Sequence, residues 1–363
     1  MKRAREKHAY SLKMQTSTNF ISASFCFCFS QSKCKPLIID VFNHFYPKEY
    51  LDALPKPFPN AITWISSDNP ATGGKGKSII DLDFRIREME KFRIDKQILS
   101  LPQPTLDDLP SNVPVEEFNK IYKAGNDGIA KIAENSCGRF KGIATVSLLD
   151  VQEAVEETER SVKDLGLLGV QVLSNVRGKP LDMPEFEPLY AKVSQLGCGL
   201  WIHPSYIRKI YDWMNDAYNM NMMMGWGIDT ALATFRIFRS GVLERHPDIK
   251  IVTHHLGTLI PLMAGRINGF VIGQGKNGLP PLPLKKTPIE YLKMFYVDTA
   301  EGMWKPALNL AHSFYGSSHM LFGSDYPWGD TSKIIDNIKA LSITEEEKRM
   351  ILGENAAKLF QME

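Results

Sequence analysis

Eight short apolar runs, separated by longer amphipathic stretches, are the feature that most limits how this chain can fold. The runs are rich in Val, Ile, Leu and Phe, as expected for strands that are buried on both faces. Strands that alternate with helices predict βαβ units and a parallel sheet. We therefore predict an α/β fold, a (β/α)8 TIM barrel. The predicted strands are residues 37–42, 96–101, 140–147, 168–173, 199–202, 249–254, 295–298 and 320–324.

The segments between these runs carry helix start and stop signals. Apolar residues at helical spacing predict helices over residues 150–166 and 184–197. Near the end of the chain, Thr344 and Glu347 form a predicted capping box. We expect the helix that follows it to end at Gly353.

The composition is that of an ordinary soluble globular protein, with 44% hydrophobic and 23% charged residues among 363. A net charge of +2 gives no electrostatic footprint for nucleic acid or an anionic membrane. No apolar run approaches the ~20 residues that span a bilayer. Cys137 and Cys198 stand singly in the body of the chain, which fits a reducing, cytoplasmic location.

Residues 1–36 differ from the remainder, with a basic start and a stretch rich in Ser, Phe and Cys. A signal or transit peptide would explain that composition. A cysteine metal site is a second reading, but Cys-x-Cys-x5-Cys is not a zinc-finger spacing. We favour an unstructured leader, or an extension upstream of a true start at Met14. Residues 37–363 are then the barrel domain.

Long irregular stretches follow some of the predicted strands. Residues 55–77 and 274–288 are rich in Pro and Gly, and residues 218–227 contain a cluster of Met. Loops after the strands build the C-terminal face of a barrel, so we expect long loops over that face. For the Met cluster we favour packing under a loop over contact with a substrate.

Four polar residues stand at the ends of predicted strands: His44, His203, His255 and Asp325. Strand ends converge on one mouth of a barrel, although these residues are far apart in the sequence. Three imidazoles and a carboxylate there would suit a divalent metal with a water beside it. A single His beside an apolar run is usually a structural residue. Polar residues at four strand ends together favour a functional site. His246 lies in a helix-to-strand turn and is interpreted as structural.

The motifs IIDVFNHFYP, WIHP, SGVLERHPDIKIVTHHLG, YVDTA, LFGSDYPW and LGENAAKLF resemble those of the amidohydrolase-related family 2. That group is typified by aminocarboxymuconate-semialdehyde decarboxylase, and the resemblance covers residues 37–361. It implies that His44, His203 and Asp325 bind zinc, with manganese as the alternative. It also implies that His255 activates water and handles the proton beside Asp325.

Position 42 departs from the family pattern. The resemblance implies a first strand that ends in His-x-His, but here the first position is Phe42. Residues 42 and 44 share one face of a strand, so Phe42 should project into the metal space without offering a lone pair. Three protein ligands remain, as in many catalytic zinc sites. We expect weaker metal retention or a shifted metal.

Two further positions are assigned through the same resemblance. His254 stands where relatives usually have glycine, and strand alternation should turn it away from His255, in a structural role. Arg266 matches an arginine that reaches the substrate carboxylate in the neighbouring subunit, a task suited to its planar fork. This implies a homodimer. The alternative for Arg266 is a helix arginine paired with a surface acid.

The predicted function is a metal-dependent, non-oxidative decarboxylase, a carbon–carbon lyase, of a small unsaturated or aromatic carboxylic acid. In that reaction the metal lowers the pKa of its water and His255 accepts the proton, while the metal and Arg266 stabilise developing charge. A hydrolase that opens a lactone or an amide is the first alternative. A metal-poor, non-catalytic relative is the second, and Phe42 is its main support.

Overall fold

The computed structural model describes residues 36–55, 76–102, 114–205, 220–273 and 284–362. They belong to one compact unit, Pro36–Glu363. Apart from Pro36, the predicted leader lies outside the described residues. So do most of the two predicted loops at residues 55–77 and 274–288.

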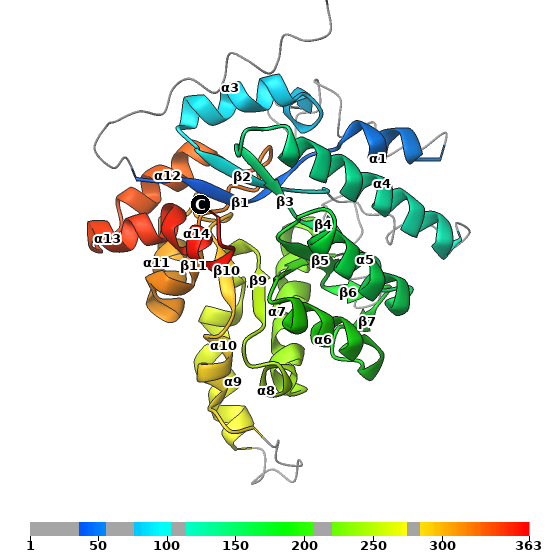
Figure 1. The fold of residues 1–363 in the computed structure, drawn as a ribbon. Helices are drawn as coiled ribbons and strands as arrows, with labels where there is room; N and C mark the ends of the chain where they lie inside the picture. Colours follow the sequence, from blue (N-terminus) through cyan, green and yellow to red (C-terminus); the bar gives the residue numbers. More distant parts are fainter. Residues whose placement is uncertain (1–35, 56–75, 103–113, 206–219, 274–283, 363) are drawn as a thin grey trace, which may run out of the picture. The chain divides into compact units, whose positions relative to one another are not determined.

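Parallel strands form the centre of this unit, and each lies where the sequence predicted one (Figure 1). Their order around the ring follows the order along the chain. The third predicted strand is divided in two, because its pairing passes from β2 to β5 at Ile143. The strands are β1 (Ile39–His44), β2 (Lys96–Ser100), β3 (Phe140–Gly142) with β4 (Ala144–Thr145), β5 (Gly169–Leu173), β8 (Gly199–His203), β9 (Lys250–Thr253), β10 (Tyr296–Asp298) and β11 (Met320–Leu321).

The ring closes where the last strand meets the first. The backbone N–H of Val41 donates to the carbonyl of Phe322 at 2.9 Å, and the N–H of Asp325 donates to the carbonyl of Phe42 at 2.8 Å. The N–H of His44 donates to Tyr326 at 3.0 Å. These bonds satisfy edges that would otherwise remain open, so the predicted TIM barrel is confirmed.

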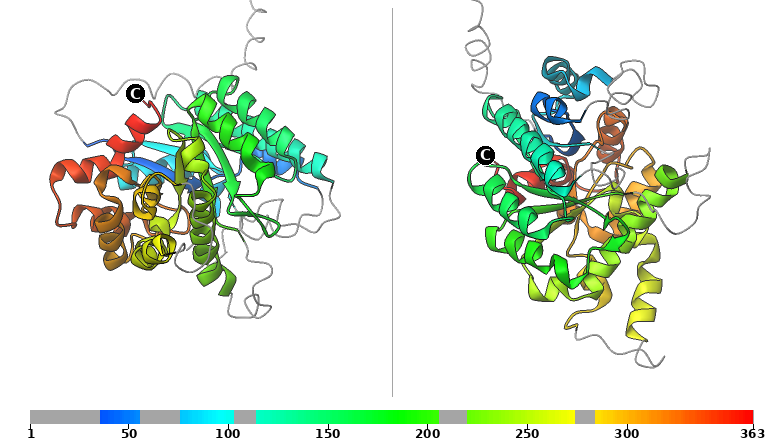
Figure 2. Two further views of the ribbon diagram at one scale, coloured as in Figure 1. Left: turned by 90° about the horizontal axis from the view of Figure 1, so that it is seen from below. Right: turned by 90° about the vertical axis from the view of Figure 1, so that its right-hand side faces the viewer.

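Helices surround the ring of strands, as Figures 1 and 2 show. Their buried faces meet the outer faces of the strands in the largest apolar cluster. A short antiparallel pair, β6 (Asn175–Val176) and β7 (Lys179–Pro180), lies outside the barrel sheet. The helices are α1 (Lys48–Ala53), α3 (Leu82–Phe92), α4 (Val115–Glu134), α5 (Val151–Lys163), α6 (Glu187–Leu196), α7 (Trp226–Arg239), α8 (Val242–Arg245), α9 (Ile260–Ile272), α10 (Pro288–Leu292), α11 (Lys305–Tyr315), α12 (Thr331–Lys339), α13 (Glu345–Arg349) and α14 (Asn355–Leu359).

A second apolar cluster fills the barrel interior at the end opposite the strand carboxyl termini. It combines inward-facing residues of most strands with residues in and after α14. The Trp201 ring stacks on Phe360 with centroids 4.7 Å apart, so the last helix closes this end of the barrel. The strand residues of the cluster are Ile39, Val41, Ile98, Trp201, Val252 and Leu321.

The helices and the capping box predicted from the sequence are confirmed, and only the predicted C-terminal end at Gly353 is wrong. The Thr344–Glu347 capping box is present. Gly353 does not end its helix, because a π-helical turn, η10 (Met350–Glu354), continues into α14. A Cβ at Gly353 would lie 2.2 Å from the Leu37 carbonyl oxygen, so this glycine permits close approach to the first strand instead. Among the described residues, no helix is long and apolar enough to cross a membrane.

Buried polar residues behind β1 support the barrel at its closure. The Asp40 carboxylate accepts bonds from Gln97 Nε2 at 3.0 Å and from the Ser324 backbone at 3.0 Å. Arg85 is fully buried and donates to the Ser78 carbonyl at 2.9 Å and to Asn43 Oδ1 at 3.2 Å. Burial raises the pKa of Asp40 to about 6, although the bonds from Ser324 and Gln97 oppose that shift.

The raised pKa of Asp40 predicts a stability change with pH. In the unfolded chain this carboxyl titrates near 3.8, so the folded state binds the proton more tightly than the unfolded state does. Protonation of Asp40 therefore stabilises the fold. That contribution is complete below pH 3.8 and is lost as the pH rises to about 6. Asp40→Asn cannot ionise. As the pH rises through this range, we expect the free energy of unfolding of the wild type to decrease by about 2–3 kcal/mol relative to that of Asp40→Asn. Urea unfolding at stepped pH measures the difference, and parallel profiles would contradict the assignment.

Candidate active site

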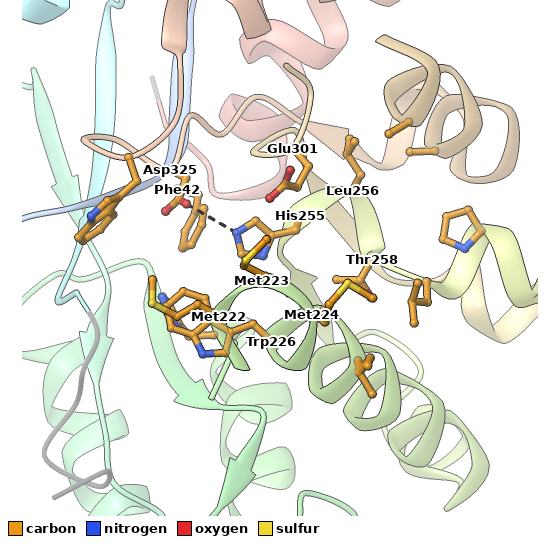
Figure 3. A pocket seen from close by; sticks show the side chains of 18 of the residues that line it. Phe42, Met222, Met223, Met224, Trp226, His255, Leu256, Thr258, Glu301 and Asp325 are labelled. Carbon is orange, nitrogen blue, oxygen red and sulfur yellow. Dashed lines mark ion pairs between the residues drawn. The ribbon is translucent and has the colours of Figure 1, made fainter. Parts of the chain in front are cut away.

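A pocket of about 490 Å³ lies at the carboxyl ends of the strands (Figure 3). All four residues predicted from the strand ends line it: His44, His203, His255 and Asp325. The predicted convergence of these four side chains is confirmed, and their roles stay a prediction. Its other described lining residues are Phe42, Met222, Met223, Met224, Trp226, Gly227, Ile228, Leu256, Thr258, Leu259, Pro261, Glu301, Ala307, Leu310, Ala311 and Trp328.

His44 and Asp325 meet because β1 pairs with the last strand. His44 is 1% exposed at the end of β1. Its Nδ1 lies 3.1 Å from the Ser100 hydroxyl, which itself donates to the Asn43 carbonyl at 3.0 Å. This leaves Nε2 of His44 directed at Asp325 Oδ1, 3.2 Å away. Asp325 has φ +53°, a left-handed conformation that is costly for a non-glycine residue.

His203 is fixed in a neutral tautomer. Its Nδ1 lies 2.8 Å from the Pro204 carbonyl oxygen, which can only accept, so Nδ1 carries the proton. Burial lowers the pKa of this imidazole, and the nearby His44 and His254 lower it further. Nε2 therefore keeps its lone pair. A histidine held by a backbone carbonyl in this way is the usual form of a metal ligand.

His255 stands in a strained turn that Asp298 supports. Residues 255–258 all have positive φ, and only Gly257 among them lacks the steric penalty. Asp298 Oδ1 accepts from the His255 and Ala300 backbone N–H groups, both at 3.0 Å. The turn therefore depends on one buried carboxylate at the end of β10. Strain of this kind concentrates at functional sites.

The turn brings His255 to the second oxygen of Asp325. Nε2 lies 3.6 Å from Oδ2, the ion pair drawn in Figure 3. Burial lowers the pKa of His255, but the hydrogen bond and charge of Asp325 outweigh it and raise the value to about 9. Burial raises the pKa of Asp325, yet His255 and His44 hold it well below its usual range. The pair thus combines a protonated imidazole with a carboxylate.

Phe42 occupies the space between the histidines, as predicted from its alternation with His44. Its ring centroid lies 4.8 Å from that of His44 and 5.7 Å from those of His203 and His255. It stacks face to face on His254, with 3.7 Å between centroids and 17° between planes. A phenyl ring therefore forms the floor of the pocket.

His254 does not line the pocket. Its backbone is extended, with φ −86° and ψ 170°, and the left-handed residues begin at His255. That it points away from His255 stays a prediction. The His254 side chain is fully buried beneath Phe42, and its Nδ1 contacts Asp298. Its Nε2 has no hydrogen-bond partner among the described residues. The predicted structural role remains a prediction.

A divalent metal fits these residues by their donor chemistry. His203 offers a neutral Nε2 lone pair, Asp325 is ionised, and His44 is oriented by Ser100. Within the described part of the chain, no three His, Cys, Asp or Glu side chains already surround a single point as ligands. His44 and Asp325 instead contact each other directly. Metal binding would separate this pair, and the Phe42 ring limits the space below it.

The predicted Met cluster lines the pocket, since Met222, Met223 and Met224 project from a π-helical turn, η6 (Asn221–Gly225). Its packing under a loop stays a prediction. Sequence reasoning missed Glu301. Glu301 follows directly on the YVDTA strand, a strand-end position that could have indicated it. His246 pairs with Glu187 at 2.8 Å, in agreement with a structural role.

Arg266 lies outside this pocket. It is exposed on α9 and packs over the Phe270 ring at 4.7 Å. Among the described residues that line the pocket there is no Lys or Arg.

Solved structures with this fold include decarboxylases. 5-Carboxyvanillate decarboxylase from Sphingomonas paucimobilis aligns with a TM-score of 0.80 and 26% identity, over 91% of this chain and 100% of that one. The enzyme from Novosphingobium aromaticivorans, in complex with manganese and 4-hydroxy-3-methoxy-5-nitrobenzoic acid, aligns with a TM-score of 0.79 and 25% identity. That alignment covers 90% of this chain and 96% of the other.

Relatives by sequence carry similar names. A 2-amino-3-carboxymuconate-6-semialdehyde decarboxylase from Dictyostelium discoideum is 28% identical over 91% of this chain and 93% of its own length. A gamma-resorcylate decarboxylase from Rhodococcus jostii is 29% identical over 77% and 88%. The family model described as Amidohydrolase matches residues 80–362. The chain therefore belongs to the amidohydrolase family.

Proposed function

We propose that this chain is a metal-dependent, non-oxidative decarboxylase of an unsaturated or aromatic carboxylic acid. The observation that most directly supports this proposal is the His255–Asp325 pair, which faces an apolar pocket between His44 and His203. Relatives and solved structures named as decarboxylases support the reaction class. Residues 37–363 would be the catalytic domain, behind a leader of residues 1–36.

His44, His203 and Asp325 are the proposed metal ligands. Manganese in a similar solved structure supports a divalent ion, and zinc is the alternative. When bound, the metal supplies positive charge against the substrate carboxylate and the charge that develops as carbon dioxide leaves. The apolar walls exclude water from that charge and so strengthen the interaction.

His255 is the proposed proton donor to the substrate carbon, which replaces the predicted role as acceptor of a proton from water. Its Nε2 faces both the pocket and Asp325, so the proton on Nε2 is held beside the reacting carbon. As the bond to the carboxylate carbon breaks, its electron pair remains on the substrate carbon and takes up this proton. Asp325 stabilises the imidazolium before transfer. The products are the protonated substrate carbon and carbon dioxide.

Arg266 would act from the partner in a homodimer. The face of α9 around it exposes Leu262, Phe270 and Ile272 by 67%, 58% and 62%, an apolar surface of the kind that mediates association. An arginine delivered across that interface would bind the substrate carboxylate bidentately. Cys137 and Cys198 stand singly in the sequence, which fits the proposed cytoplasmic location.

The first test is carbon dioxide release from gamma-resorcylate, a monocarboxylic acid, followed with His255→Asn. We expect release by the unmodified protein and a loss of about 10²–10⁴-fold in kcat for the variant, because the positioned proton donor is gone. His319→Gln is the control, since that ring stacks on Tyr296 at the start of β10. Opening of a lactone without release of carbon dioxide would identify a hydrolase instead.

The second test is metal content by mass spectrometry. We expect close to one divalent metal per chain in the unmodified protein, and slower loss to a chelator in Phe42→His, which adds an imidazole donor beside His44. Phe42→Leu keeps an apolar side chain and should match the wild type. If the unmodified protein contains no metal and Phe42→His does, the result would support the non-catalytic alternative.

The third test is complementation between inactive subunits. Arg266→Ala and His255→Asn should each lack activity, but co-expressed chains should recover about a quarter of it, because half of the dimers pair one intact pocket with one intact arginine. Light scattering checks that dimers form. Mixed dimers without recovery would remove Arg266 from the partner's site.

A further inference from the structure

The walls of the pocket differ in character from its His–Asp end. Met222, Met223 and Met224 line one side from η6. Trp226 and Trp328 stand near the histidines, with ring centroids 6.4 Å from His203 and 5.2 Å from His44. Thioether and indole side chains present apolar, polarisable surfaces that pack well on an aromatic ring. A volume of about 490 Å³ exceeds what a single small ring fills.

Glu301 is the one acidic residue among these described walls away from Asp325. It follows β10, is exposed, and reaches the His255 side of the pocket, as Figure 3 shows. Its negative charge contributes to the raised pKa of His255, but within the described part of the chain its carboxylate accepts no hydrogen bond. A carboxylate that accepts no hydrogen bond, beside apolar walls, is available to a ligand.

The charges around the pocket limit what can enter it. Asp325 and Glu301 are acidic, and no Lys or Arg lines the described walls. A reacting carboxylate would be met at the metal end and by the partner's arginine. The charge of His255 is already paired with Asp325, so a second carboxylate at the mouth would face Glu301, and apolar surroundings strengthen that repulsion. A hydroxyl or amino group there would donate to Glu301.

We propose that the substrate is an aromatic monocarboxylic acid with an extended apolar body and a hydroxyl or amino group at its far end. Glu301 is the residue that selects it, by accepting a hydrogen bond from that group and by repelling dicarboxylates. The Met222–Met224 turn and the two tryptophans bind the apolar body. This inference rests on the proposed function for the identity of the reacting carboxylate.

The test compares two ligands that differ in one group: 6-hydroxy-2-naphthoate and naphthalene-2,6-dicarboxylate. Their dissociation constants are measured by calorimetry with the metal-loaded protein, Glu301→Gln and the control Glu90→Gln, an exposed glutamate on α3. We expect the hydroxy acid to bind at least about tenfold tighter in the wild type and the control. In Glu301→Gln this ratio should fall about tenfold, chiefly because the diacid binds better.

Because the readout is binding, it separates the two proposals. An unchanged ratio in Glu301→Gln, or no binding of either acid, overturns the selectivity, even if carbon dioxide is released from another substrate. A ratio that shifts as expected supports Glu301, and absence of carbon dioxide release would then count against the decarboxylase alone. Thermal unfolding of Glu301→Gln should match the wild type, because the side chain is exposed and accepts no hydrogen bond from the described residues.

Discussion

The pairing of the first strand with the last is the constraint on which the rest of this structure depends. Three backbone hydrogen bonds from residues 41–44 and 325 close the ring, and they also bring His44 to Asp325. The buried bonds of Asp40 to Gln97 and Ser324 fix the same junction from behind. Barrel closure and assembly of the candidate site are thus one structural event.

Much of this arrangement could be predicted from the sequence, because parallel strands impose a simple rule. Buried runs announce the strands, and side chains at the strand ends converge, so His44, His203, His255 and Asp325 were found by position alone. The Phe42 obstruction followed from the period of two along a strand.

The rest was hidden because it depends on backbone conformation that no period describes. The left-handed run at residues 255–258 directs His255 to the pocket, and the π-helical turn at η6 directs three methionines to it. Gly353 resembled a helix stop, yet its role is close contact with Leu37. Each of these features is set by tertiary packing, which overrides local preference.

The stacked pair of Phe42 and His254 gives this site its individual character. A flat contact at 3.7 Å seals the pocket floor with two rings, one of them held by Asp298. The two rings fill the space below the pocket, so a metal held by His44, His203 and Asp325 would lie on the open side of Phe42. Polar chemistry is confined to one layer, formed by His44, His203, His255 and Asp325, between an aromatic floor and the softer walls that contain methionine.

The position of the last helix also sets when the barrel can form during synthesis. Trp201 in the barrel interior is covered by Phe360, and the edge of the first strand that does not pair with β2 is paired by residues 322–326. Gly353 also approaches this strand. A nascent chain that still lacks these residues keeps an open edge and an uncovered apolar interior. The barrel can therefore close only after its carboxyl end has been synthesised, which makes closure a late step in folding.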